Sequence, residues 1–428
     1  MPIIITLDDL ARIELITADH DKDRFEIQKD TFDILQRKPD ELAGYKRAAE
    51  ENLAQWKQQS ATADRARKVR VMSGDWGDVT LQASKETGHT YAVLNMANAY
   101  SVGGGYLRGA IAQEENIYRR SDCHNYIEQD EVKEINIAAG RMLYTEEMTH
   151  LINAQHGKVY LDAEHARVCF RGPEIPGDPA ASYLKLSKEN CFLFYEMKSA
   201  AVDLRQRAGT SDDRESMRLK IEAQLFTLIK HGIRHVVLGA FGCGAFRNPP
   251  QEVALLYQEA LKQYGAYFDD VVFAVYDGAY GPKNYPVFAD SLNNMPLPES
   301  HILDTKNLND FETTLQELNN YLNEAYSKDC PDSYTKIEKK LLLFDRKEVS
   351  INTGFKQIRD ILEKAGMPLE LKVQTILNIC TSQNRKNEPK GYHQHYKAIQ
   401  NIINTNLLLD WEQVEADEDK SSPPSPDM

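Results

Sequence analysis

The chain has 428 residues, enough for two or three domains that each bury a core of their own. It is 42% hydrophobic and 27% charged, and its formal net charge of -14 argues against nucleic-acid binding, because nonspecific phosphate contacts need a basic surface. No run approaches the roughly 18 apolar residues of a membrane span, and the N-terminus lacks the basic and apolar regions of a signal peptide. We therefore expect an intracellular, soluble protein without membrane contact.

The spacing of the cysteines argues against a zinc site. All six are scattered and none forms a CxxC pair, which fits a reducing compartment and argues against a zinc site. We expect no metal and no cofactor. An anionic small ligand remains compatible with the acidic composition, since backbone N–H groups at helix N-termini can hold phosphates without charged side chains.

The first half of the chain predicts an α/β domain behind a helical extension. Residues 22–67 are polar and helix-prone, with acids leading and bases trailing, as the helix dipole favours. Beyond them, short apolar runs alternate with helical stretches, a pattern typical of layered α/β domains. We expect strands at Lys68–Met72, Tyr91–Met96, Arg167–Cys169, Cys191–Tyr195, His235–Gly239 and Val271–Val275, and helices at Asp78–Glu86, Gln113–Ile127, Asp213–His231 and Pro250–Tyr264.

Past Asn284 a proline-containing connector leads into segments that are almost wholly helical. The expected helices are Asp310–Ser327, Tyr334–Phe344, Gly354–Ala365, Pro368–Cys380 and Tyr392–Leu409. The predicted domains are a helical extension at 1–67 packed on a catalytic domain at 68–290, an all-α domain at 300–412, and a disordered acidic tail at 413–428. The all-α domain could receive a protein partner that the sequence does not identify.

The stretch VLNMANAYSVGGGYLRGAIAQEE carries the first candidate site. An apolar strand leads into three glycines, Gly103, Gly104 and Gly105, and two acids, Glu114 and Glu115, follow where a helix begins. The glycines permit positive φ and close approach of a ligand, and successive N–H groups in such a turn can bind an anion. Taken singly, a glycine turn and an acidic helix start are both ordinary structural features. Together, after a buried strand, they indicate a site.

The stretch VVLGAFGCGAF carries the second candidate site. Here too a strand ends in glycines, Gly242 and Gly244, and a helix follows. Phe241 and Phe246 could pack against a sugar or base, although core packing explains each ring equally well. The stretch is neither a P-loop nor a dinucleotide fingerprint. Because ligands of open α/β sheets bind at the carboxyl edge of the strands, the two glycine loops predict a phosphorylated, sugar-bearing ligand held between them.

The spacing GGG-x7-QEE resembles the signature of bacterial-type poly(ADP-ribose) glycohydrolases, which are macrodomain enzymes. RFEIQKDTFDIL, VCFRG and VVFAVYD extend the similarity over roughly residues 22–290. The resemblance implies a macrodomain-like α/β/α sandwich with a central mixed sheet, and ADP-ribose or an ADP-ribosylated protein as the ligand.

The resemblance also implies roles for single residues. Glu115 matches the catalytic glutamate and Glu114 the acid that orients the scissile ribose. Asn98 matches the asparagine at the same ribose, with Asn95 as the alternative. The residues that it places around the remaining ligand are Gly103, Gly104, Gly105, Gln113, Gly242, Cys243, Gly244, Ala245 and either Phe246 or Phe241; Asp75 or Asp78 would contact adenine, unless they cap a helix.

Chemistry supports these assignments, because breaking a ribose glycosidic bond passes through an oxocarbenium-like state and needs a proton on the leaving oxygen. A buried carboxyl beside a second carboxyl can hold that proton. Hydrolysis of poly(ADP-ribose) with Glu115 as general acid and base is the expected activity. A mono-ADP-ribosyl-protein hydrolase, acting for example on arginine linkages, and a non-enzymatic ADP-ribose reader are the alternatives. The expected location is the cytoplasm, or a host cell if the chain is a secreted bacterial effector.

Overall fold

The computed structural model describes residues 5–13, 19–60, 67–277, 283–298, 308–329, 357–383 and 393–407. The chain divides into two compact units, Met1–Ser300 and His301–Met428. The helix expected at Tyr334–Phe344 and the tail at 413–428 lie outside the described residues.

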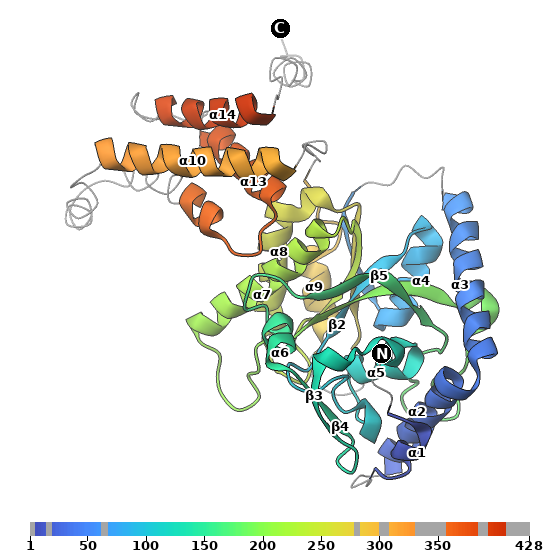
Figure 1. Ribbon diagram of the computed structural model, residues 1–428. Helices are drawn as coiled ribbons and strands as arrows, with labels where there is room; N and C mark the ends of the chain where they lie inside the picture. The colour runs from blue at the N-terminus through green and yellow to red at the C-terminus, as the bar shows by residue number, and fades with distance from the viewer. Residues whose placement is uncertain are drawn as a thin grey trace. The chain divides into compact units, whose positions relative to one another are not determined.

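A six-stranded sheet forms the centre of the first unit (Figure 1). Its order is β1-β8-β7-β2-β6-β5, and every neighbouring pair is parallel except β5, which runs antiparallel to β6. The mixed sheet and the α/β class are therefore confirmed. The strands are β1 (Val69–Ser73), β2 (Tyr91–Met96), β5 (Tyr160–Cys169), β6 (Phe192–Ser199), β7 (His235–Gly239) and β8 (Asp270–Val275).

Helices pack on the sheet in two groups, which lie on opposite sides of it in Figure 1. One group holds α3 (Pro39–Ser60) and α4 (Trp76–Thr87), and the other holds α7 (Ser211–Lys230), α8 (Pro250–Tyr264) and α9 (Asn284–Leu292). The central strands β2, β7 and β8 are buried along nearly their whole length, and all six residues of β8 are buried. Such continuous apolar strands are expected where both faces of a parallel sheet are covered.

The structure adds elements that the sequence did not predict. A hairpin of β3 (Val132–Asn136) and β4 (Arg141–Tyr144) precedes α6 (Glu146–Ile152). The edge strand β5 begins at Tyr160, well before the predicted start at Arg167. Its first part was not predicted because a bulge between Asp162 and Arg167 interrupts the alternating pattern of the strand. The helix predicted at Gln113–Ile127 ends sooner, as α5 (Gln113–Arg120), followed by a short 3₁₀ turn.

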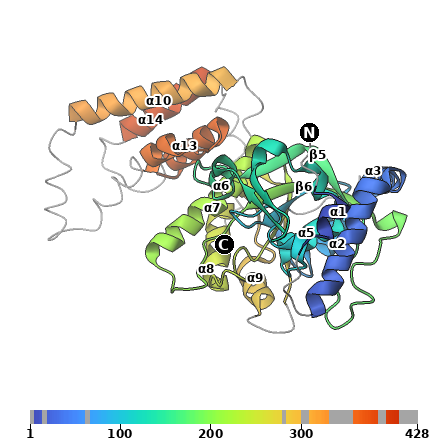
Figure 2. The ribbon, with the colours of Figure 1, turned by 60° about the horizontal axis from the view of Figure 1, so that its bottom comes forward.

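The N-terminal helices brace the region around α5 (Figure 2). A short helix, α1 (Leu7–Leu10), contacts α2 (Asp19–Arg37), which packs against α5. The hydroxyl of Thr31 in α2 donates a hydrogen bond of 2.8 Å to the carbonyl of Arg119, at the end of α5. The extension is thus joined to the helix that carries Glu114 and Glu115.

The described part of the second unit consists of helices and a turn at 364–368. Its helices are α10 (Leu308–Asp329), a short helix at 357–363, α13 (Leu369–Gln383) and α14 (His393–Leu407). Their contacts bury a small apolar core that includes Leu318, Ile358, Leu371, Tyr396 and Ile403. Among the described residues of the whole chain, no helix is long and apolar enough to cross a membrane.

Candidate active site

The start of α5 is tied to the end of β2 by the side chain of Gln113. Its Oε1 accepts a hydrogen bond of 2.9 Å from the N–H of Met96, and its Nε2 donates one of 2.7 Å to the carbonyl of Leu94. The amide therefore satisfies backbone groups that the strand leaves unpaired where it ends. Gln113, predicted as a substrate contact, fixes the position of the two glutamates that follow it.

The glycine triplet wraps around these glutamates. Gly103 and Gly104 have φ values of 64° and 61°, in the left-handed region that glycine adopts without strain. A Cβ on Gly104 would overlap Oε1 of Glu115 and would lie 2.9 Å from Oε2 of Glu114. The N–H of Gly105 donates a hydrogen bond of 2.8 Å to the same Oε1 of Glu115. Glycine is thus required at position 104 both by the backbone and by the carboxylates.

Glu114 and Glu115 are both buried, with 3% and 8% of their surface exposed. Glu114 accepts a hydrogen bond of 2.7 Å from the N–H of Asn98 through Oε2. Its Oε1 and the Oε2 of Glu115 are buried without a partner among the described residues. Burial, and then the neighbouring Glu115, raise the pKa of Glu114 well above its usual range. Glu114 therefore retains a proton at a pH where an exposed glutamate would have lost it.

The raised pKa of Glu114 predicts a stability difference that depends on pH. Folded Glu114 keeps its proton above the ordinary glutamate pKa of 4.5, whereas the unfolded chain releases it, so stability falls as the pH rises above that value. Glu114→Gln removes this titration. The variant is expected to be more stable than the natural chain at pH 7, by about 0.5–2 kcal/mol, and the gain should vanish near pH 4. Urea unfolding at several pH values measures it, and a difference that does not vary with pH would contradict the assignment.

The two asparagines near the end of β2 have different surroundings. Asn95 is fully buried and its amide donates a hydrogen bond of 2.7 Å to Glu196 in β6. Asn98 is half-buried, and its Oδ1 accepts hydrogen bonds of 2.9 Å from the N–H groups of Tyr100 and Ser101. Asn95 therefore belongs to the core, and Asn98 remains the candidate for contact with a ribose.

A buried ion pair lies on β6, the strand next to β2, and it was not predicted from the sequence. Lys198 and Glu196 of β6 are each 1% exposed, and Nζ of Lys198 lies 3.8 Å from Oε2 of Glu196. Burial alone would lower the pKa of Lys198, but Glu196 and other neighbours raise it well above its usual range. Lys198 also acts electrostatically on Glu114, whose pKa it lowers. The cation thus offsets part of the negative charge gathered around the glutamates.

Removing this cation is expected to destabilise the fold. Lys198→Met removes one of two cations beside the buried carboxylate of Glu196, since Nε of Arg167 also lies 3.9 Å from its Oε2. Breaking a buried ion pair costs up to about 3–5 kcal/mol in proteins. The double variant Glu196→Gln/Lys198→Met should recover part of that loss, since it removes both members of the pair while Arg167 keeps its ion pair with Asp162. Urea unfolding of the natural chain and both variants measures the difference. Equal stability of the single and double variants would contradict the pairing.

The second glycine loop follows β7 and is held by a side chain that the sequence analysis missed. Asn248 donates hydrogen bonds from Nδ2 to the carbonyls of Val202, at 2.7 Å, and Gly242, at 3.1 Å. Gly242 has a φ of 73°, and a Cβ there would lie 2.5 Å from that of Ala201. A Cβ on Gly244 would meet nothing within 4 Å. The loop is thus anchored at Gly242 and open at Gly244.

The two phenylalanines of this loop differ in burial. Phe241 is fully buried and belongs to the core, so it offers no ring to a ligand. Phe246 is half-buried, with the guanidinium of Arg205 5.1 Å from its ring centroid. Phe246 is therefore the aromatic candidate.

Two further residues of this loop were predicted as ligand contacts. Cys243 is 7% exposed, and burial raises its thiol pKa to about 12, so its side chain is an unreactive packing group. Ala245 is exposed.

Both loops leave the same edge of the sheet. β2 and β7 are parallel neighbours, so their carboxyl ends lie side by side. A Cβ on Gly239, the last residue of β7, would overlap the methyl group of Met96, the last residue of β2. The predicted juxtaposition of the two loops is present in the fold.

Asp75 and Asp78, the candidates for adenine contact, lie at the start of α4. Asp75 caps this helix by accepting hydrogen bonds from the N–H groups of Gly77 and Asp78, at 3.1 and 2.9 Å, and it pairs with the buried guanidinium of Arg120. Its carboxylate thus has a structural role. The side chain of Asp78 is 56% exposed and stays available to a ligand.

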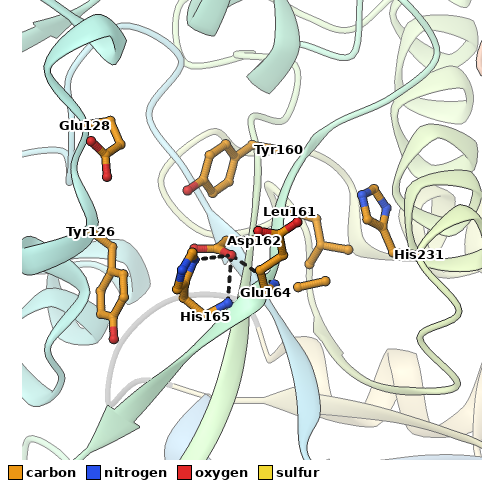
Figure 3. Close-up of a pocket in the computed structure, with 9 residues that line it drawn as sticks. Tyr126, Glu128, Tyr160, Leu161, Asp162, Glu164, His165 and His231 are labelled. Carbon is orange, nitrogen blue, oxygen red and sulfur yellow. Dashed lines mark hydrogen bonds and ion pairs between the residues drawn. The ribbon is translucent and has the colours of Figure 1, made fainter.

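A separate pocket of about 500 Å³ lies on the edge strand β5 (Figure 3). Asp162 accepts hydrogen bonds there from the N–H groups of Glu164 and His165, which closes the bulge of the strand. Within the described chain, no group of three or more His, Cys, Asp or Glu residues could hold a metal ion. None of the residues that line the pocket comes from either glycine loop; they are Tyr126, Glu128, Tyr160, Leu161, Asp162, Ala163, Glu164, His165 and His231.

Residues 20–154 match the family model described as microbial-type PARG, catalytic domain. This match spans less than half of the chain. It includes Gly103–Gly105 and Gln113–Glu115, so the predicted family is confirmed for the part of the chain that carries the first loop. The second glycine loop lies beyond the matched residues.

Solved structures of bacterial poly(ADP-ribose) glycohydrolases are similar to the chain. One is the enzyme from Thermomonospora curvata, at 24% identity and a TM-score of 0.43, over 63% of this chain and 100% of that chain. Another is the enzyme from Deinococcus radiodurans in complex with ADP-ribose, at 21% identity and a TM-score of 0.37, over 56% of this chain and 90% of that chain. No curated protein matches the chain.

Proposed function

We propose that the chain is an ADP-ribose glycohydrolase, which binds ADP-ribose at the two glycine loops and hydrolyses its ribose glycosidic bond. The observation that carries this proposal is the buried pair Glu114 and Glu115. Each has one oxygen held by a backbone N–H of the first loop and one oxygen without a partner among the described residues. The match of residues 20–154 to a PARG catalytic domain supports the same activity.

In the proposed reaction, Glu115 donates its proton to the leaving oxygen as the bond between that oxygen and the ribose C1 breaks. The positive charge that develops on the ribose is steadied by the nearby diphosphate. Water then forms a bond to C1 and gives a proton back to Glu115. Glu114 and Asn98 orient the ribose through its hydroxyl groups. Burial and the neighbouring carboxylate raise the pKa of Glu114, the acid next to Glu115 in the chain.

The remaining loop residues would bind the ligand mainly through their backbones. Gly103, Gly104 and Gly105 allow close approach on one side, and residues 242–245 do so on the other. Phe246 would lie beside the distal ribose. We place Gln113 and Phe241 in the scaffold of the site, because the side chain of Gln113 is engaged with β2 and Phe241 is fully buried.

Two other functions compete with this one. A mono-ADP-ribosyl-protein hydrolase would use the same glutamates on a different linkage, and a reader would bind ADP-ribose without cleaving it. A reader does not need two buried carboxyls, each with an unpaired oxygen, so the pair favours an enzyme. A cytoplasmic location, a role as a secreted effector, and a protein partner for the second unit stay predictions.

Release of ADP-ribose from three substrates separates these functions. The full chain would be incubated with poly(ADP-ribose), with arginine-linked and with glutamate-linked mono-ADP-ribosylated protein, while calorimetry measures its affinity for ADP-ribose. We expect binding, and release from the polymer. Binding without release from any substrate would identify a reader, and release from a protein linkage alone would identify the mono-ADP-ribosyl hydrolase.

A further inference from the structure

Arg108 is a cation of the first loop that has no role in the proposed reaction as described above. It ends a 3₁₀ turn, Tyr106–Arg108, in the spacer between the glycines and the glutamates. Tyr106 and Leu107 are buried, at 0% and 1% exposed, whereas Arg108 is exposed. The turn thus anchors itself with two apolar side chains and presents a guanidinium to solvent.

The stem of Arg108 is held in place by packing. A Cβ on Gly140, in the turn of the β3–β4 hairpin, would lie 2.6 Å from Cγ of Arg108, 3.3 Å from its Cδ and 3.1 Å from Cγ2 of Ile13. The methylene groups therefore lie across the hairpin turn, beside Ile13. This contact restricts the directions in which the charged end can point.

The charged end of Arg108 and the carboxylate of Glu115 both lie near Gly105. A Cβ on Gly105 would lie 3.7 Å from Nη2 of Arg108 and also 3.7 Å from Oε1 of Glu115. The backbone N–H of Arg108 donates a hydrogen bond of 3.0 Å to the carbonyl of Gly105, but its guanidinium makes no hydrogen bond or ion pair with any described residue. By contrast, Arg119 and Arg120, which lie just beyond the glutamates in α5, bind the carbonyls of Ala110 and Arg171. Arg108 is thus an exposed cation next to the reacting carboxyl, in a chain whose net charge is -14.

We propose that Arg108 is a specificity-determining residue that binds an anionic group on the leaving-group side of the bond that Glu115 acts on. The proposal rests on the proposed function. In poly(ADP-ribose) the leaving group is another ADP-ribose unit, which carries a diphosphate. In a mono-ADP-ribosylated protein the leaving group is an amino-acid side chain. A guanidinium binds phosphate through paired, charge-assisted hydrogen bonds, so Arg108 favours the polymer.

Kinetics of the full-length variants Arg108→Ala and Arg108→Lys on polymer and on arginine-linked mono-ADP-ribosylated protein test this. Losing one charge-assisted contact lowers kcat/KM for the polymer by about 10- to 100-fold in Arg108→Ala, with partial retention in Arg108→Lys. The affinity for free ADP-ribose, which has no leaving group, should hardly change. Added NaCl should reduce the activity of the natural chain on polymer more than that of Arg108→Ala. Arg37→Ala, which removes an exposed arginine of α2, controls for the loss of one charge.

The outcomes distinguish this proposal from the one on which it rests. Equal losses on both substrates, or a matching loss of affinity for free ADP-ribose, would mean that Arg108 supports the loop or binds ADP-ribose itself, and would overturn its role in specificity. A natural chain that releases ADP-ribose from neither substrate would overturn the glycohydrolase activity. In that case the binding of polymer relative to free ADP-ribose still tests Arg108, because Arg108→Ala must weaken the polymer complex selectively.

Discussion

Glu115→Gln is expected to lose about 10²- to 10⁴-fold in the rate of ADP-ribose release, the range for removing a general acid–base group, and to keep its affinity for ADP-ribose. Glutamine has nearly the size of glutamate and keeps an oxygen that can accept the hydrogen bond from Gly105. It cannot supply a proton to the leaving oxygen or accept one from water. Steady-state kinetics on poly(ADP-ribose), together with calorimetric binding of ADP-ribose, separates the two effects.

The matched control is Glu51→Gln, which makes the same change at an exposed position of α3. It should leave both turnover and affinity as they are in the natural chain. If Glu115→Gln turned over at the natural rate, Glu115 would not be the acid. If it lost affinity and rate together, the residue would serve binding or folding instead of proton transfer.

Gly104→Ala is expected to be the most damaging single-methyl change in the first loop. Its φ of 61° is strained for any residue with a Cβ, and the new methyl group would overlap Oε1 of Glu115. The carboxylates or the loop must move, so turnover should be lost, and forcing a methyl group into a packed site should cost about 1–3 kcal/mol of stability. Activity assays and urea unfolding of the same preparation measure both consequences.

Gly232→Ala separates the effect of backbone strain from that of the contact. Gly232 has a φ of 67°, close to that of Gly104, but a Cβ there would meet nothing within 4 Å. The control should therefore show the cost of the left-handed backbone alone, with normal turnover. Equal effects of the two variants on stability and activity would show that Gly104 does not lie against the glutamates.

The elements that could be predicted from the sequence are uniformly buried, and polar residues, glycines or prolines mark their ends. β2 and β7 were predicted with the boundaries that the structure shows, because each is an apolar run that ends at a polar or glycine-rich loop. α8 begins at a proline and was predicted equally well. The shared edge of the two glycine loops followed from the parallel arrangement of these strands.

Tertiary pairing overrode local preference elsewhere. The helix predicted at Gln113–Ile127 stops at Arg120 because the next residue, Ser121, bridges to Cys169 in β5, and Asp122 bonds to the backbone of Val168. Such contacts join residues almost 50 positions apart. The alternating pattern of β5 was hidden by its bulge and by its exposed polar residues.

The place of the candidate site in the fold was predicted from the sequence, whereas the roles of its residues stay predictions. The glutamates, Asn98 and both glycine loops lie at the sheet edge where they were expected. The structural roles of Gln113 and Phe241 could not be predicted. A residue type alone does not reveal which backbone group a side chain will bond to, or whether a ring will pack in the core. Lys198 and Asn248 gave no signal either, since both act through contacts across the fold.

A crystal structure of the full-length Glu115→Gln variant with ADP-ribose tests the central claim most directly. The account predicts the diphosphate between the first loop and residues 242–246, with the C1 end of the distal ribose facing residue 115 and its hydroxyl groups bonded to Glu114 and Asn98. ADP-ribose bound away from these loops, or with its adenine end against Glu114, would contradict the account.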